Sequence, residues 1–154
     1  MALTVAQDGE APNCKPAVPP STTPRLAVCR MDRDGILLEP SHASHCYPTG
    51  PNEVLVNLDI ALPVRVRKLF HESDCHPAQW VGRTADGDVI YVRYRHGRLW
   101  IGLAPDLLRT PPTTLLQTGY GDYGDGYLSF RSLRRRTRGV VEWPKRTRRP
   151  GLTL

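Results

Sequence analysis

The sequence predicts a small α+β domain dominated by β-strands. We expect an antiparallel meander, which can curl into a partly open small barrel, and one short C-terminal helix. Two Gly-containing turns, Asp86-Gly87 and His96-Gly97, separate three stretches with apolar residues at alternating positions. A capped helical pattern begins at Ser129. The chain has 154 residues, of which 40% are apolar, and this length fits one domain.

The ends of the chain differ in composition from its middle. Residues 1–24 hold five prolines among small polar residues, and their apolar residues follow no period. We therefore expect a disordered, proline-rich segment at 1–24. The β-rich domain is expected at 25–144, followed by a basic C-terminal tail at 145–154.

The first predicted element of the domain is a hairpin. Residues 26–29 and 36–38 are short apolar runs that flank an Asp-Gly turn within 32–35. Residues 40–53 are rich in proline and small polar residues, which predicts a loop. Apolar residues then alternate with others through 54–60, which predicts a strand. After a proline the alternation resumes through 64–67, which predicts a second half-buried strand or the continuation of the first.

The strand pairing of the meander follows if both glycine turns contain two residues. Arg93 then lies opposite Trp100 on one side and opposite Trp80 on the other. In this register one face is apolar and forms the predicted core, which contains Val81, Ile90, Val92, Tyr94, Leu99, Ile101 and Leu103. Arg83 is the single residue that does not fit this face.

The opposite face of the meander is the first candidate binding surface, and it combines aromatic rings with arginines. Its members are Trp80, Tyr91, Arg93, Arg95, Arg98 and Trp100. Flat rings next to positive charge suit single-stranded nucleic acid or a partner with exposed carboxylates. Alternatively, the C-terminal helix packs over this face through Phe130 and Leu133 and buries the tryptophans.

The C-terminal part is expected to contain a loop, a helix and a short final strand. Residues 105–126 are loop-like, and a helix is predicted at 129–138, with Ser129 as its N-cap and Gly139 at its end. Residues 140–143 predict a last short strand or docking segment.

Positive charge is concentrated in this C-terminal part. The segment 130–149 carries nine basic residues and one acid, a formal charge of +8, which leaves −2 for the rest of the chain. The basic residues are Arg131, Arg134, Arg135, Arg136, Arg138, Lys145, Arg146, Arg148 and Arg149. Such a block attracts a phosphate backbone or an acidic protein surface. Alternatively, it is a solvated helix face and a loose tail.

Two clusters of histidine and cysteine are compatible with a zinc site. They contain His42, His45 and Cys46, followed by His71, Cys75 and His76. The spacings His42-x2-His45 and His71-x3-Cys75 fit two halves of a tetrahedral site. The alternative is loop histidines and half-buried thiols, because the sequence has no CxxC pair.

Several classes of protein are not expected. The sequence has no GxSxG, HExxH or phosphate-loop motif, so we expect no enzyme and no cofactor apart from this zinc hypothesis. No apolar run is as long as a membrane span, and the first 20 residues do not resemble a secretory signal. We therefore expect a cytoplasmic protein with reduced thiols.

The leading functional hypothesis is a non-enzymatic binding module for nucleic acid, which combines the basic helix and tail with the aromatic-arginine face. One alternative is a protein-binding inhibitor or anti-defence accessory protein that blocks a larger nucleic-acid-handling complex. Another alternative is a small structural zinc protein.

Overall fold

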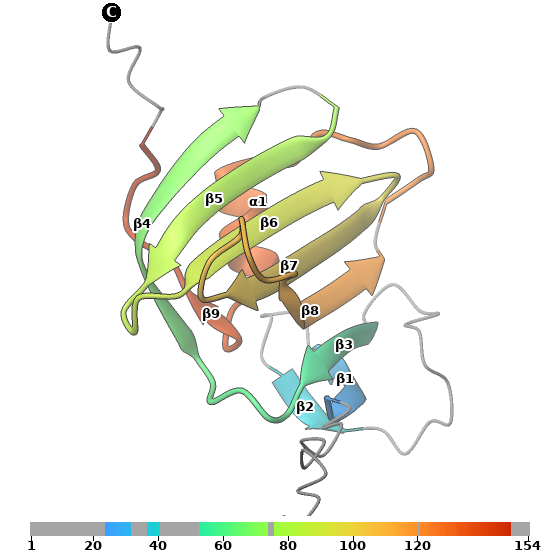
Figure 1. Ribbon diagram of the computed structural model, residues 1–154. Coiled ribbons are helices and arrows are strands. Elements are labelled where there is room, and N and C mark those ends of the chain that lie inside the picture. Colours follow the sequence, from blue (N-terminus) through green and yellow to red (C-terminus); the bar gives the residue numbers. More distant parts are fainter. Residues whose placement is uncertain (1–23, 32–36, 41–52, 74–75, 120, 149–154) are drawn as a thin grey trace, which may run out of the picture.

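The computed structural model describes residues 24–31, 37–40, 53–73, 76–119 and 121–148. In these ranges, nine strands form one sheet with the order β2-β1-β3-β8-β7-β6-β5-β4-β9 (Figure 1). The strands are β1 Leu26–Met31, β2 Leu37–Pro40, β3 Glu53–Asn57, β4 Val64–Ser73, β5 Ala78–Thr84, β6 Val89–Arg95, β7 Arg98–Ala104, β8 Thr113–Gly119 and β9 Val141–Glu142. The helix is α1, Phe130–Arg136.

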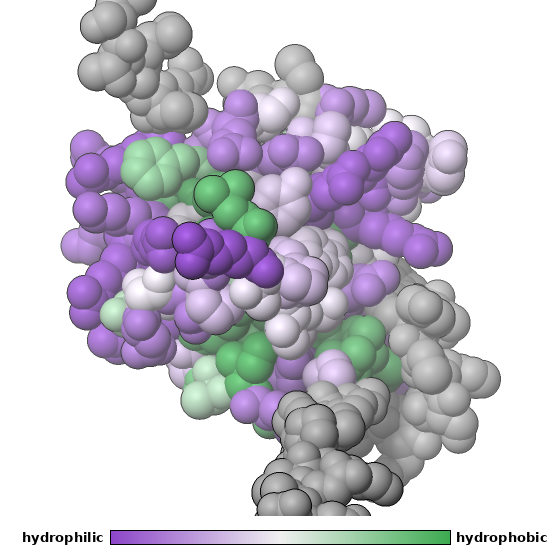
Figure 2. Space-filling view, in the orientation of Figure 1, coloured by the Kyte–Doolittle hydropathy of each residue, from purple (hydrophilic) through white to green (hydrophobic). Residues whose placement is uncertain are grey.

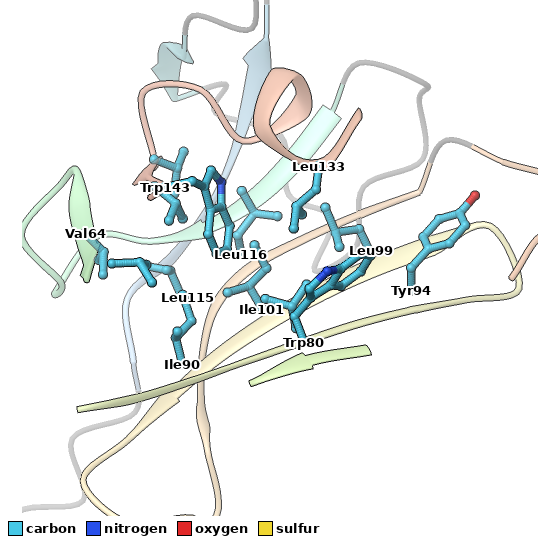
Figure 3. Close-up of a cluster of buried hydrophobic side chains, with 14 of the residues drawn as sticks. Val64, Trp80, Ile90, Tyr94, Leu99, Ile101, Leu115, Leu116, Leu133 and Trp143 are labelled. Atoms are coloured by element: carbon cyan, nitrogen blue, oxygen red, sulfur yellow. The ribbon is translucent and has the colours of Figure 1, made fainter. Parts of the chain in front are cut away.

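The fold class is as predicted: a β-dominated, mostly antiparallel half-barrel with one short helix. Neighbouring strands are antiparallel, except that β9 runs parallel to β4. The sheet curves around α1, which lies on its inner face (Figure 1). Leu133 of α1 points toward Leu99 and Ile101 of the sheet, and Trp143 closes the same core (Figure 3).

The predicted first hairpin is confirmed in its strands, because β1 pairs with β2 in antiparallel fashion. Its turn at 32–36 and the predicted loop through 41–52 lie outside the described residues. The next strand ends at Asn57, three residues before the predicted end. The Asn57 side chain accepts a hydrogen bond from the Asp59 N–H at 3.0 Å and thereby turns the chain.

The predicted register between β6 and β7 is confirmed. Arg93 lies opposite Trp100, and Arg95 lies opposite Arg98. The turn between them contains His96 and Gly97 with φ of 53° and 68°, the left-handed conformation that a two-residue hairpin turn requires at both positions.

The predicted register between β5 and β6 is wrong by one residue. Trp80 lies opposite Val92, whereas the prediction placed it opposite Arg93. The cause is a three-residue turn: the Thr84 N–H donates to the Asp88 carbonyl at 2.9 Å, and Gly87 takes the left-handed position with φ of 99°.

This shift of one residue exchanges the faces of β5. Trp80 now points into the core, while Val81 and Arg83 point to the outer face. The exposed Arg83 donates to the Gly87 carbonyl at 2.8 Å, so the residue that did not fit the predicted core is explained.

The prediction of a loop at 105–126 is wrong for Thr113–Gly119, which form strand β8. Strand β8 inserts between β3 and β7, and its register with β7 shifts between Ile101 and Gly102. Both Leu115 and Leu116 are buried at this bulge, which breaks the alternation of apolar and polar residues that identifies a strand.

Helix α1 begins as predicted, because the Ser129 hydroxyl accepts a hydrogen bond from the Ser132 N–H at 3.2 Å. It ends at Arg136, two residues before the predicted end. The hydroxyl of Thr137 donates to the Leu133 carbonyl at 2.9 Å and accepts from the Trp143 indole at 2.6 Å. The predicted last strand is β9.

After β9 the chain stays beside β4. The Arg148 N–H donates to the Leu69 carbonyl at 2.8 Å, and the His71 N–H donates to the Arg148 carbonyl at 2.9 Å. The expected disordered segment, except Pro24, and the last part of the tail, 149–154, lie outside the described residues. Among the helices in the described part, none has the length and apolar character needed to cross a membrane.

Candidate functional site

A hollow on the outer face of the sheet brings together five of the six residues predicted for the aromatic-arginine surface. We call it the outer hollow, and its volume is about 490 Å³. Strands β6, β7 and β8 line it with Tyr91, Arg93, Arg95, Arg98, Trp100 and Gln117. The strand pairing brings these residues together, since Trp100 lies between Arg93 on β6 and Gln117 on β8. Figure 2 shows the molecule from the side of the sheet that faces away from α1, and many of the side chains on this surface are hydrophilic.

The two aromatic rings of the outer hollow are held in fixed orientations. The Trp100 indole lies over Gly102, where a side chain would collide with the ring. Its N–H donates to the Thr114 hydroxyl at 3.1 Å. Tyr91 meets the indole edge-on, with 5.9 Å between ring centroids and an interplanar angle of 61°.

The three arginines of the outer hollow leave its positive charge unbalanced. Among the described residues, no acidic one lines it, and the guanidinium groups of Arg93, Arg95 and Arg98 form no ion pair or hydrogen bond with this part of the chain. Arg95 and Arg98 are direct cross-strand partners, an arrangement in which like charges destabilise a sheet. The Nε of Arg93 is buried, and no described residue forms a hydrogen bond with it.

Trp80 does not belong to this surface, and its assignment there was wrong. The three-residue turn puts Gln79 opposite Arg93 and moves Trp80 to the core, where its exposed fraction is 0%. Trp80 stacks on His71 with 4.9 Å between ring centroids. Helix α1 covers this inner face, so the alternative of burial by the helix applies to Trp80 and not to Trp100.

A second basic surface lies along α1. We call it the helix groove; its volume is about 870 Å³. Its lining consists of Pro63, Phe130, Arg131, Arg134, Arg135, Arg138, Gly139, Val141, Glu142, Trp143 and Lys145. The acid in this lining, Glu142, is already paired with Arg65 at 2.9 Å. The hydrogen bond that Arg65 donates to Glu142, and then the negative charge of Glu142, raise the pKa of Arg65.

Aromatic rings form part of the wall of the helix groove. Phe130 and Trp143 meet edge to face, with ring centroids 6.4 Å apart. The Arg134 guanidinium lies 5.9 Å from the centre of the Phe130 ring, within the range of a cation–π contact. Trp143 is held by its hydrogen bond to Thr137, so this wall is anchored in the core.

Three described residues of the predicted basic segment lie outside both hollows: Arg136, Arg146 and Arg148. Arg136 is half-buried, and its positive charge acts to lower the pKa of Tyr94. Burial, and then the charge of Asp125, nevertheless raise the pKa of Tyr94. Arg146 is exposed but does not line the helix groove.

The zinc hypothesis falls mostly on residues that are not described. His42, His45, Cys46 and Cys75 lie outside the described residues. Of the remaining two, His71 stacks on Trp80, and the His76 Nε2 lies 2.9 Å from the Gly124 carbonyl oxygen. Within the described ranges, no group of three or more His, Cys, Asp or Glu side chains could hold a metal ion.

Burial raises the pKa of the Cys29 thiol, which keeps it protonated in the core.

Sequence reasoning missed Gln117 and Trp143 as members of these surfaces, and Thr114 as the hydrogen-bond partner of Trp100; Gln117 and Thr114 share one strand. That strand is β8, which has no strand periodicity in the sequence because of its bulge. Trp143 was expected only as part of a last short strand or docking segment. The chain matches no protein-family model, and no curated protein or solved structure matches it significantly.

Proposed function

We propose that this protein is a non-enzymatic nucleic-acid-binding module whose helix groove holds a phosphate backbone. The observation that carries the proposal is the set of five cations in this groove: Arg131, Arg134, Arg135, Arg138 and Lys145. None of the five forms an ion pair or a hydrogen bond through its side chain with the described residues. The neighbouring acid, Glu142, is paired with Arg65.

The arrangement of these arginines is unfavourable unless an anion is present. Arg131 and Arg134 are three residues apart on α1, and Arg131 and Arg135 are four apart. Like charges at these spacings destabilise a helix by about 0.2–0.5 kcal/mol per pair. A polyanion removes this repulsion, and the planar guanidinium group can donate two parallel hydrogen bonds to one phosphate.

The spacing of the cations favours a nucleic acid over an acidic protein. Neighbours on one helix face are about 5–6 Å apart, which is a dense row of positive charge. A nucleic acid carries a phosphate at every nucleotide and matches such a row without any special sequence. The rings of Phe130 and Trp143 add an apolar wall beside the row.

The test is binding of labelled oligonucleotides, measured by fluorescence anisotropy at low salt. The helix-groove variant carries Arg134→Ala, Arg135→Ala and Arg138→Ala. We expect its affinity to fall by about 10- to 100-fold, because charge-assisted contacts to three phosphates are lost. The loss should be similar for different base sequences, since phosphates carry no sequence information.

The matched control removes the same charge elsewhere. It carries Arg30→Ala, Arg67→Ala and Arg109→Ala, three exposed positions that line neither hollow. We expect a loss of less than about threefold, from weaker long-range attraction alone. Equal losses in the two variants would contradict the proposed site. Displacement of the oligonucleotide by polyglutamate at an equal concentration of charge would instead favour an acidic protein partner.

A further inference from the structure

We infer that the outer hollow is a second nucleic-acid site, which takes an unpaired segment, so that one molecule holds two segments at once. This inference rests on the proposed function of the helix groove. It goes further because it assigns the opposite face of the sheet a separate ligand of the same chemical class.

The two surfaces lie on opposite sides of the molecule. On β7, Leu99 and Ile101 point to the core, whereas Trp100 between them points to the outer hollow. Helix α1 packs on the inner face through Leu133 (Figures 1 and 3), whereas its Arg131, Arg134 and Arg135 are exposed. The sheet and a helix with a diameter of about 10–12 Å therefore separate the two sites. A short oligonucleotide that occupies one site leaves the other free.

The chemistry of the outer hollow favours unpaired nucleotides. Trp100 is held in place by Thr114 and Gly102, so it presents a rigid ring at little entropic cost. A base in a duplex is already stacked on its neighbours, whereas an unpaired base is free to stack on an aromatic ring. The side chain of Gln117 adds a hydrogen-bond donor and an acceptor for a base edge.

The positive charges of the outer hollow favour the binding of an anion. Arg95 and Arg98 face each other directly across the strands, and Arg93 lies next to them with a buried Nε that has no hydrogen-bond partner among the described residues. A phosphate between these guanidinium groups would remove their repulsion and supply acceptors. The same group of residues therefore provides for both the base and the backbone of a single strand.

The first test is energy transfer between two short single-stranded oligonucleotides, one with a donor dye and one with an acceptor. A length of about 8 nucleotides suits one such site. With limiting protein we expect transfer for the wild type and for the control Arg30→Ala/Arg109→Ala. The variant Arg95→Ala/Arg98→Ala should lose the transfer but keep its affinity for one oligonucleotide within about threefold, because the helix groove is intact.

The outcomes separate this inference from the proposed function. If the wild type binds no oligonucleotide, the proposed function and this inference both fail. If it binds one oligonucleotide per chain without transfer, this inference is overturned and the proposed function stands. If the Arg95→Ala/Arg98→Ala variant keeps the transfer, paired chains that each hold one oligonucleotide explain it, and the inference is again overturned.

A second measurement tests the preference for unpaired segments. The helix-groove variant keeps the outer hollow, so a single-stranded oligonucleotide should still quench the fluorescence of Trp100. A blunt duplex of the same length should quench it at least tenfold more weakly at the same concentration. Equal quenching by the duplex would overturn the assignment to single strands, and no quenching by either ligand would overturn the second site itself.

Discussion

Trp80 and Trp100 show that one additional residue in a turn decides whether a neighbouring strand turns its tryptophan into the core or to the outer face. Because the β5–β6 turn holds three residues, Trp80 packs in the core against His71, while Trp100 borders a solvent-exposed hollow with three arginines. The first indole contributes to the stability of the fold. The second is placed to contact a ligand, and its orientation is set by Thr114.

This difference predicts which tryptophan an anionic quencher reaches. Trp80 and Trp143 are 0% and 8% exposed, so iodide should quench mainly Trp100, near which the arginines concentrate anions. We expect Trp100→Phe to remove most of the quenchable emission and Trp80→Phe to leave it. Stern–Volmer plots of the two variants measure this. Quenchable emission that disappears with Trp80→Phe would contradict the observed register.

At the scale of elements, the two glycine turns of the meander look alike in sequence but differ in their surroundings. Gly87 has open space around it, whereas Gly97 abuts the backbone of Gly121, which donates to the Gly97 carbonyl at 3.1 Å. His96 also stacks on Tyr123 at 4.4 Å. The loop before α1 therefore packs against the β6–β7 turn.

The glycine turns provide a matched pair of substitutions. Gly87→Ala should cost about 1–2 kcal/mol, because alanine is strained at a positive φ. Gly97→Ala should cost at least about 1 kcal/mol more, since its Cβ would also meet the Gly121 carbonyl. Urea unfolding followed by far-ultraviolet circular dichroism gives both free energies. Equal losses would show that the loop does not pack on this turn.

The predictability of each element depended on how local its cause is. The β6–β7 register and the Ser129 cap were predictable, because a few adjacent residues determine them. The β5–β6 register was not, since Asp-Gly fits turns of two or three residues, and Arg83 was the only sign of the shift. Strand β8 was missed because its bulge buries two consecutive leucines.

At the scale of the whole molecule, the important feature is the separation of positive charge onto two faces. The charge of +8 in 130–149 was visible in the sequence, but the direction of each arginine was not. Arg134 and Arg135 of α1, and Arg138 just after it, line the groove, whereas Arg136 is half-buried and its charge acts on Tyr94. The two expected surfaces, the aromatic-arginine face and the basic C-terminal part, therefore correspond to two separate hollows, of which each keeps part of the predicted residues.

The most direct test of nucleic-acid binding is its dependence on salt. If each of the five cations in the helix groove displaces a counterion from a single strand, the logarithm of the binding constant falls linearly with the logarithm of salt concentration. The expected slope is about −3 to −4, at about 0.7 for each phosphate contact. A slope near zero, or no binding at low salt, would contradict this account.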